Sequence, residues 1–143
     1  MEKKPPSPID RAFEFEAYIP VYDNGNVVDA ITTDGKDVRI NKSIKSLINS
    51  LMRKNSIDMR LLRKNLSEYT ERKIFIPIPI SSGIVLVPVK VRRTVITNDG
   101  AYAYINLNSA KKLSGERNCI IALNCGRKIT SLESEKTIRA RMK

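Results

Sequence analysis

Histidine and tryptophan are both absent from this chain of 143 residues. Without an imidazole, the chain can form neither a Ser-His-Asp triad nor a histidine-based metal site. Its two cysteines, Cys119 and Cys125, are separated by five residues and lack the C-x-x-C spacing of zinc and redox sites. We therefore expect two reduced, half-buried thiols and no bound metal.

Glycine is scarce and dispersed, with six residues that form neither a G-x-G-x-x-G motif nor a P-loop. The closest pairs of acids are Glu14 with Glu16 and Glu133 with Glu135. Neither pair has a recognisable catalytic partner, so we expect both on solvated strand or helix faces. The sequence thus predicts no enzymatic activity, no cofactor and no small-molecule substrate.

Long apolar runs are missing as well. No stretch approaches the roughly 18 apolar residues of a membrane-spanning helix, and residues 1–6 (Met-Glu-Lys-Lys-Pro-Pro) lack the apolar core of a signal peptide. The expectation is a soluble protein without a membrane partner, located in the cytoplasm.

Positive charge, by contrast, is abundant. Lys and Arg number 26 against 15 Asp and Glu, which gives a net charge of +11 and an isoelectric point near 9.9. The charge is concentrated in two blocks, residues 42–73 and 111–143, each with a net +6. Such an excess is the usual electrostatic signature of a polyanion-binding protein, because lysine and arginine release the counterions condensed on phosphates.

Hydrophobic periodicity predicts an α+β fold, an antiparallel β-meander with a short central helical insertion and a C-terminal helix. Residues 1–12 are expected to form a flexible arm and residues 13–143 a single DNA-binding domain. Helices are predicted at residues 44–51, 56–66 and 134–142, with Asn41 or Ser43 as the first N-cap. Strands are predicted at residues 13–19, 27–33, 38–40, 74–80, 84–91, 93–97, 101–107, 119–123 and 128–132. The Asn24-Gly25 pair between the first two strands favours a tight hairpin turn.

Two of these strands carry more specific expectations. Residues 13–19 alternate strictly, which places Phe15, Ala17 and Ile19 on one face and Glu16 and Tyr18 on the other. Residues 74–80 contain two prolines, which cannot donate to a β-ladder, so this segment is expected to be an edge strand or an extended connector and a candidate pairing edge.

Basic residues on the predicted helices and turns are the candidate DNA contacts. Arg60, Arg63 and Lys64 would share one helical face. Arg127 and Lys128 follow a glycine at a hairpin tip, from which side chains can enter a groove. The full candidate set is Arg53, Lys54, Arg60, Arg63, Lys64, Arg72, Arg92, Arg93, Arg127, Lys128 and Arg139. The expected phosphate contacts are Lys54, Lys64, Arg72 and Lys128. The expected groove-inserting residues are Arg53, Arg60, Arg63 and Arg127.

Tyr102 and Tyr104 alternate with two alanines and are expected on one sheet face. Such a pair could stack on the bases of a single strand. The segment 101–109 carries no basic residue, however, which favours a packing role for both rings.

The order of motifs resembles the competence transcription factor (ComK) family. The resemblance is carried by residues 34–36 (Asp-Gly-Lys), by Arg63-Lys64, by residues 74–82 (an apolar strand with Pro and Ser after it) and by residues 123–129 leading into a helix near Ser134. Leu62 stands where the family has glycine before Arg-Lys, and Val85-Leu86-Val87 replaces a family tryptophan. The resemblance implies a transcription regulator that binds A/T-rich duplex DNA through the minor groove as an oligomer.

We therefore predict a basic, homo-oligomeric DNA-binding regulator. Two alternatives stay open. The chain could be a binding module for RNA or single strands, with Tyr102 and Tyr104 stacking on bases. It could also be a small protein-interaction inhibitor whose charge docks onto an acidic partner.

Overall fold

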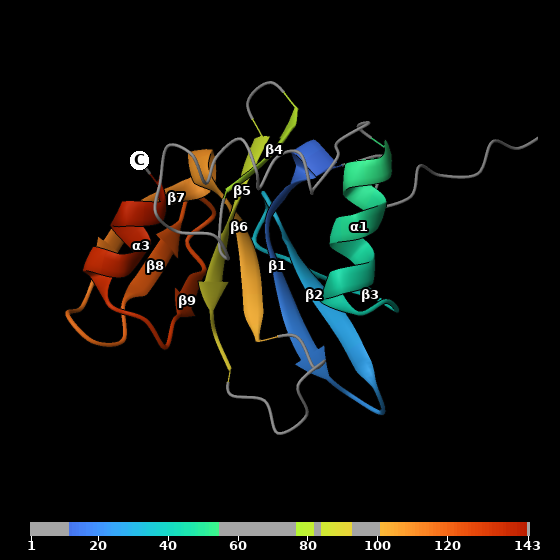
Figure 1. Ribbon diagram of the computed structural model, residues 1–143, viewed down its shortest axis with the longest axis horizontal. Helices are drawn as coiled ribbons and strands as arrows, with labels where there is room; N and C mark the ends of the chain where they lie inside the picture. Colours follow the sequence, from blue (N-terminus) through green and yellow to red (C-terminus); the bar gives the residue numbers. More distant parts are fainter. Residues whose placement is uncertain (1–11, 55–76, 82–83, 93–100, 143) are drawn as a thin grey trace, which may run out of the picture.

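The computed structural model describes residues 12–54, 77–81, 84–92 and 101–142, and it has the predicted α+β fold (Figure 1). Six antiparallel strands form the larger sheet in the order β3-β2-β1-β6-β5-β4. Their bounds are β1 (Phe15–Tyr22), β2 (Asn26–Thr32), β3 (Asp37–Ile40), β4 (Ile78–Ser81), β5 (Ile84–Lys90) and β6 (Tyr102–Asn106). Strand β4 lies at the edge of this sheet, which confirms the expectation drawn from its prolines.

A second sheet follows in the chain, with strands in the order β7-β8-β9. It contains β7 (Ala110–Ser114), β8 (Ile120–Leu123) and β9 (Lys128–Thr130). The hairpin between β8 and β9 was predicted, whereas β7 was not. Its five residues, Ala-Lys-Lys-Leu-Ser, include only two apolar positions, and a β-bulge between Ala110 and Lys112 interrupts their alternation.

The remaining elements are helices. The α-helices are α1 (Ile44–Lys54) and α3 (Glu135–Met142), and two short 3₁₀ turns are η1 (Ala12–Glu14) and η2 (Leu107–Ser109). Both α-helices begin as predicted. Ser43 caps α1 by accepting a hydrogen bond from the Ser46 N–H at 3.2 Å, and Ser134 caps α3 by accepting one from the Thr137 N–H at 3.2 Å. The predicted helix at 56–66 and strand at 93–97 lie outside the described residues.

The first hairpin turns where the sequence predicts it. Asn24 has φ 52° and Gly25 has φ 131°, so both central residues adopt the positive φ that a tight hairpin turn requires. Only glycine and, less readily, asparagine accept this conformation without a large steric cost. The Asn-Gly pair therefore sets the register in which Tyr22 is paired with Asn26.

Strand β1 does not alternate as predicted. A β-bulge between Phe15 and Ala17 shifts the register, so Phe15 and Tyr18 share a core cluster on one face and Ala17 packs on the other. The expected grouping of Phe15 with Ala17 was therefore wrong, because an extra residue at a bulge reverses the side on which later side chains lie. The same bulge buries Glu16, whose Oε1 accepts a hydrogen bond from the Cys125 N–H at 2.9 Å. The solvated face expected for Glu16 was also wrong.

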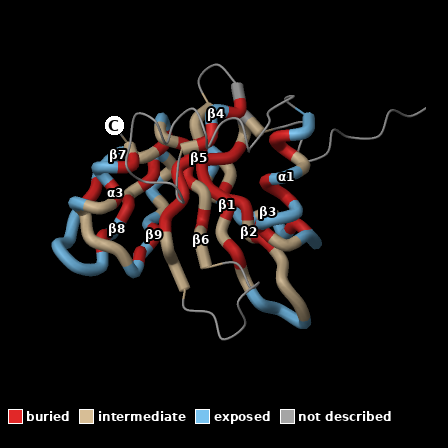
Figure 2. Tube along the Cα trace, viewed as in Figure 1, coloured by how far each residue is buried: buried red, intermediate tan, exposed pale blue. Residues whose placement is uncertain are grey.

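The large sheet has a separate core on each face. Helix α1 covers one face with Ile44, Leu47, Ile48 and Leu51. The small sheet and α3 cover the opposite face, where Leu113, Ile121, Ile129 and Ile138 pack against residues of β1, β2, β5 and β6. Figure 1 shows the result as three layers, with α1 at one end and β7–β9 with α3 at the other. Figure 2 shows buried positions concentrated on the strands between these two ends.

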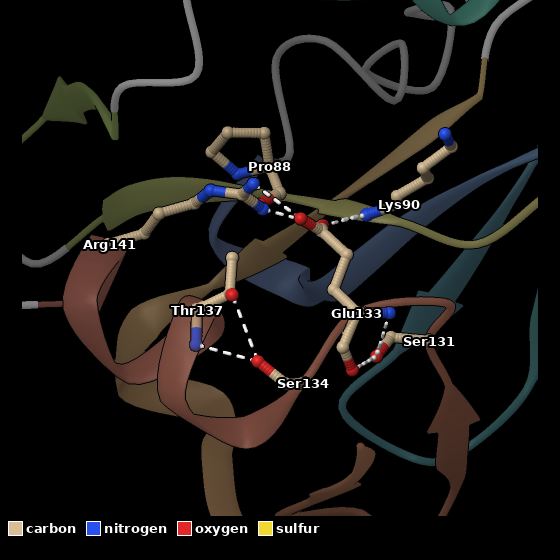
Figure 3. Close-up of polar contacts among 7 residues, drawn as sticks. All are labelled: Pro88, Lys90, Ser131, Glu133, Ser134, Thr137 and Arg141. Carbon is tan, nitrogen blue, oxygen red and sulfur yellow. Dashed lines mark hydrogen bonds and ion pairs between the residues drawn. The ribbon is translucent and has the colours of Figure 1, made fainter. Parts of the chain in front are cut away.

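A buried ion pair attaches α3 to the large sheet (Figure 3). The two Arg141 Nη atoms donate to the Glu133 carboxylate at 2.6 and 2.5 Å, and Arg141 Nη1 also donates to the Pro88 carbonyl at 3.0 Å. Glu133 Oε1 accepts a further hydrogen bond from the Lys90 N–H at 2.7 Å. Only 7% of the Arg141 side chain and 13% of the Glu133 side chain are exposed. The solvated face predicted for Glu133 was therefore wrong.

Candidate nucleic-acid interface

The outer side of α1 carries polar side chains and no acid. Lys45, Ser46, Asn49 and Arg53 are all exposed, and we call these four residues the α1 stripe. At 3.6 residues per turn they fall within about 100° of the helix circumference, and about 12 Å of helix separates the first from the last. Lys42, also exposed, precedes the helix and extends the positive charge toward its N-terminus.

The opposite side of α1 anchors the helix to the large sheet. Five apolar side chains, Ile44, Leu47, Ile48, Leu51 and Met52, are buried against the large sheet. Burial of this amphipathic face stabilises the helix, so the outer polar residues are not needed for packing. Within the described part of the chain, neither Lys45 nor Arg53 is engaged in an ion pair. Both side chains are exposed, so both are candidate contacts for a ligand.

Two of the predicted contacts, Arg53 and Lys54, lie together in the last turn of α1, and both are exposed. Sequence reasoning found these two but missed Lys45 and Asn49. The spacing of Lys45, Asn49 and Arg53, four residues apart in each step, is a helical signal that could have found them. Five predicted contacts lie outside the described residues, namely Arg60, Arg63, Lys64, Arg72 and Arg93.

Three other predicted DNA contacts lie in different parts of the chain, and each forms hydrogen bonds or an ion pair with other residues of the protein. Arg127 Nη1 donates to the Gly35 carbonyl at 3.0 Å and to Asp37 Oδ1 at 3.1 Å, which ties the β8–β9 turn to the β2–β3 turn. Arg92 Nη2 donates to Asn26 Oδ1 at 3.1 Å. Arg139 forms an i,i+4 ion pair with Glu135 at 2.8 Å on the exposed side of α3. The structure does not bring these three arginines together with the α1 stripe.

Pairing of charges differs between the two ends of the chain. In residues 12–54 six basic and six acidic residues cancel, and Arg39 illustrates how: it binds Asp29 at 2.5 Å and Asp23 at 2.9 Å. The hydrogen bonds that Arg39 donates to these carboxylates raise its pKa. Residues 101–142 carry eight basic and three acidic residues, a net +5. Within the described residues, the excess of basic over acidic side chains therefore lies mainly in the C-terminal part of the chain.

The predicted contact Lys128 belongs to this C-terminal group. It is exposed on β9, and the strand register aligns it with Ala122 of β8 and Lys112 of β7. Sequence reasoning missed Lys111 and Lys112 because β7 was not predicted. Once the strand is known, its pairing with β8 brings two lysines 16 positions apart into one row across the small sheet.

The two tyrosines of β6 are engaged in contacts within the protein. Tyr104 packs against the core cluster beneath α1, and the Arg141 guanidinium lies over the Tyr102 ring, 5.9 Å from its centroid. Burial raises the pKa of Tyr102, and the nearby Glu133 carboxylate raises it further. Both rings therefore serve as packing groups. In a single-strand-binding module the same rings would stack on bases.

The thiols provide little chemistry. Cys119 is buried, Cys125 is half-buried, and neither forms a disulfide. Burial raises the pKa of both thiols above the ordinary value for cysteine. The reactive thiolate is therefore disfavoured at neutral pH. Among the residues that the structure describes, no three metal-ligating side chains cluster.

No helix within the described ranges has the length and apolar character needed to cross a membrane. Comparison with known proteins adds no relative: no family model, no curated protein and no solved structure matches this chain.

Proposed function

We propose that this protein is a DNA-binding transcription regulator that prefers A/T-rich duplexes and uses α1 as its main contact. The observation that carries the proposal is the α1 stripe, an exposed and acid-free row of Lys45, Ser46, Asn49 and Arg53 on a helix whose other side is buried against the large sheet. Lysine, arginine, serine and asparagine are the side chains that most often donate hydrogen bonds to phosphate oxygens.

The dimensions of the stripe suit a DNA backbone. Its length of about 12 Å spans roughly three nucleotides of one strand, at a rise of about 3.4 Å each. Lys45 would contact a phosphate, and Arg53, in the last turn, would enter the groove. A narrow A/T-rich minor groove has an enhanced negative potential that attracts arginine, which is the basis of the proposed A/T preference.

The proposal includes a homo-oligomer, because one stripe is a modest footprint. Linking two copies makes the second contact intramolecular and can raise the overall affinity by about 10² to 10⁴. Strand β4 lies at the edge of the large sheet and is the candidate pairing edge. Light scattering on the purified protein, with and without DNA, would measure the number of copies.

The groove can be tested with three duplexes of equal length, composed of A·T, G·C and inosine·C pairs. Inosine lacks the guanine N2 amino group, so an inosine·C duplex presents an A·T-like minor groove and a G·C-like major groove. We expect fluorescence anisotropy near physiological salt to show inosine·C bound like A·T and both bound more tightly than G·C. If inosine·C is bound like G·C, the protein recognises the bases through the major groove. Equal, weak and salt-labile binding of all three duplexes would refute specific DNA recognition.

The contribution of α1 can be tested with a matched pair of charge reversals. Arg53→Glu lies in the stripe, and Lys36→Glu lies in the exposed β2–β3 turn, so both variants change the net charge equally. We expect Arg53→Glu to weaken binding about tenfold and to lower the slope of log K against log salt by about 1, as for a lost phosphate or groove contact. Lys36→Glu should change the affinity by about twofold or less. Equal effects would mean that only the total charge matters.

A further inference from the structure

The outer side of the small sheet forms a second acid-free basic surface. It is made by the exposed residues Lys111, Lys112, Ser114, Lys128 and Thr130, which we call the lysine face. None of the strands β7, β8 and β9 contains an acid, and none of the three lysines has an ion-pair partner in the described part of the chain. The nearest acid in sequence is Glu116, which lies beside Arg117 in the β7–β8 turn.

Strand register arranges this face for a polyanion. Lys112 and Lys128 are both in line with Ala122 on the central strand, so two strand spacings, about 10 Å, separate their backbones. Because the Ala122 side chain between the two lysines is small, it does not project between their side chains. In the next row Ser114 and Thr130 flank the exposed Ile120, and their hydroxyls can donate to phosphate oxygens.

The lysine face and the α1 stripe point in opposite directions. The inner row of the small sheet, Leu113, Ile121 and Ile129, packs against one face of the large sheet, so the lysine face is directed away from that sheet. Helix α1 packs on the other face, and its stripe is directed away from the large sheet on that side. Figure 1 shows α1 and the small sheet at opposite ends of the longest axis, with the large sheet between them.

One duplex is too stiff to reach both surfaces of the same molecule. Bending a site of 20–30 base pairs by 40–90° already costs about 1 to 6 kcal/mol, and contact with both surfaces would need a turn of about 180° around the domain. Two separate duplexes meet no such cost. We propose that a single copy of this protein bridges two DNA duplexes, one on the α1 stripe and the other on the lysine face. This inference rests on the proposed DNA binding through α1.

The test is a capture experiment run beside a binding experiment. An unlabelled duplex is fixed to beads, protein is added, and the retention of a second, fluorescent duplex is measured, while anisotropy reports binding to one duplex in solution. Two double variants are compared, Lys45→Glu/Arg53→Glu on the stripe and Lys111→Glu/Lys112→Glu on the lysine face. Each lowers the net charge from +11 to +7, so each controls for the charge change of the other. Circular dichroism checks that both variants fold.

Bridging by one copy predicts that wild-type protein retains the second duplex and that both double variants lose at least roughly tenfold of this retention. The lysine-face variant should keep its solution affinity to within about threefold, because the α1 stripe is intact. Loss of retention in the stripe variant alone would overturn the inference, since two associated copies would then bridge through their stripes. Solution binding without any retention would also overturn it and would leave the proposed function standing. Absence of solution binding would refute the proposed function itself.

Discussion

The two α-helices have similar C-terminal sequences, but their C-terminal basic side chains lie in different environments. Each carries two basic residues in its last turn, Arg53 and Lys54 in α1 and Arg139 and Arg141 in α3. In α1 the arginine is exposed, whereas in α3 Arg141 is buried in a bidentate pair with Glu133. The difference follows from the apolar content of each helix, because α1 buries five apolar side chains and α3 fully buries only Ile138.

This contrast shows when an arginine is available to a ligand. A helix with a wide apolar stripe is held by hydrophobic burial, and its polar residues have no structural task. The short helix α3, with little apolar surface, is attached by polar contacts, and these withdraw Arg141 from solvent. Charge in a sequence is therefore a guide to binding only after the anchoring of each element is known.

The largest expected effect comes from breaking the anchor of α3. Arg141→Ala leaves the Glu133 carboxylate buried without its cation, and such a change costs about 3 to 5 kcal/mol of unfolding free energy. Urea denaturation followed by circular dichroism measures it. Arg139→Ala, which removes an exposed pair, should cost under about 0.5 kcal/mol. A cost below about 1 kcal/mol for Arg141→Ala would mean that α3 is held by other contacts.

A somewhat smaller effect is expected from the apolar anchor of α1. Leu47 is fully buried, and Leu47→Ala should cost about 3 kcal/mol through lost transfer energy and the cavity left behind. Lys45→Ala on the opposite side is the matched control and should leave the unfolding free energy within about 0.5 kcal/mol. Similar losses for both variants would contradict the division of α1 into an anchoring side and a free side.

The pH dependence of stability should separate the two anchors. Burial by itself raises the pKa of Glu133, but the hydrogen bonds from Arg141 and the Lys90 N–H outweigh it and hold the pKa below its ordinary value. The stabilising contribution is therefore complete above the unfolded pKa of about 4.3 and is lost as the pH falls through the lower folded value. We expect the stability difference between wild type and Glu133→Gln to be constant above about pH 5 and to shrink in more acidic solution. The deficit of Leu47→Ala should not depend on pH in this way.

The smallest effect is expected at the two N-caps. Ser43→Ala and Ser134→Ala each remove one hydrogen bond to a free N–H at a helix start, and each should cost about 1 kcal/mol. Thermal unfolding of both variants, with Ser50→Ala in α1 as a control, would measure this. A much larger loss at Ser134 would show that its contact with the Thr137 hydroxyl, at 2.9 Å, is also important.

Much of the fold was predictable because it depends on local patterns. The apolar spacing of Ile44, Leu47 and Leu51 predicted α1, and the Asn24-Gly25 pair predicted the first hairpin. Local patterns failed where a bulge intervened, at Glu16 in β1 and at Lys111 in β7. A bulge changes the facing of every later side chain, and its position depends on the partner strand, which the local sequence does not specify.

The candidate interface was predictable to a similar degree. Arg53, Lys54 and Lys128 were identified from charge alone, and the structure places all three at the surface. Charge alone did not distinguish them from Arg127, whose guanidinium binds Gly35 and Asp37 more than 85 positions earlier in the chain. Pairing over such a distance is decided by strand order.

The sequence by itself determined the class of fold, the excess of positive charge, the helix caps and the amphipathic side of α1, because each depends on residues within a few positions of one another. Only the tertiary structure decided which basic residues are engaged and which are exposed. It paired Glu133 with Arg141, turned Arg127 toward Asp37 and aligned Lys112 with Lys128. The physical reason is that electrostatic pairing acts over a few ångströms in space, and the folding of two sheets against each other sets those distances.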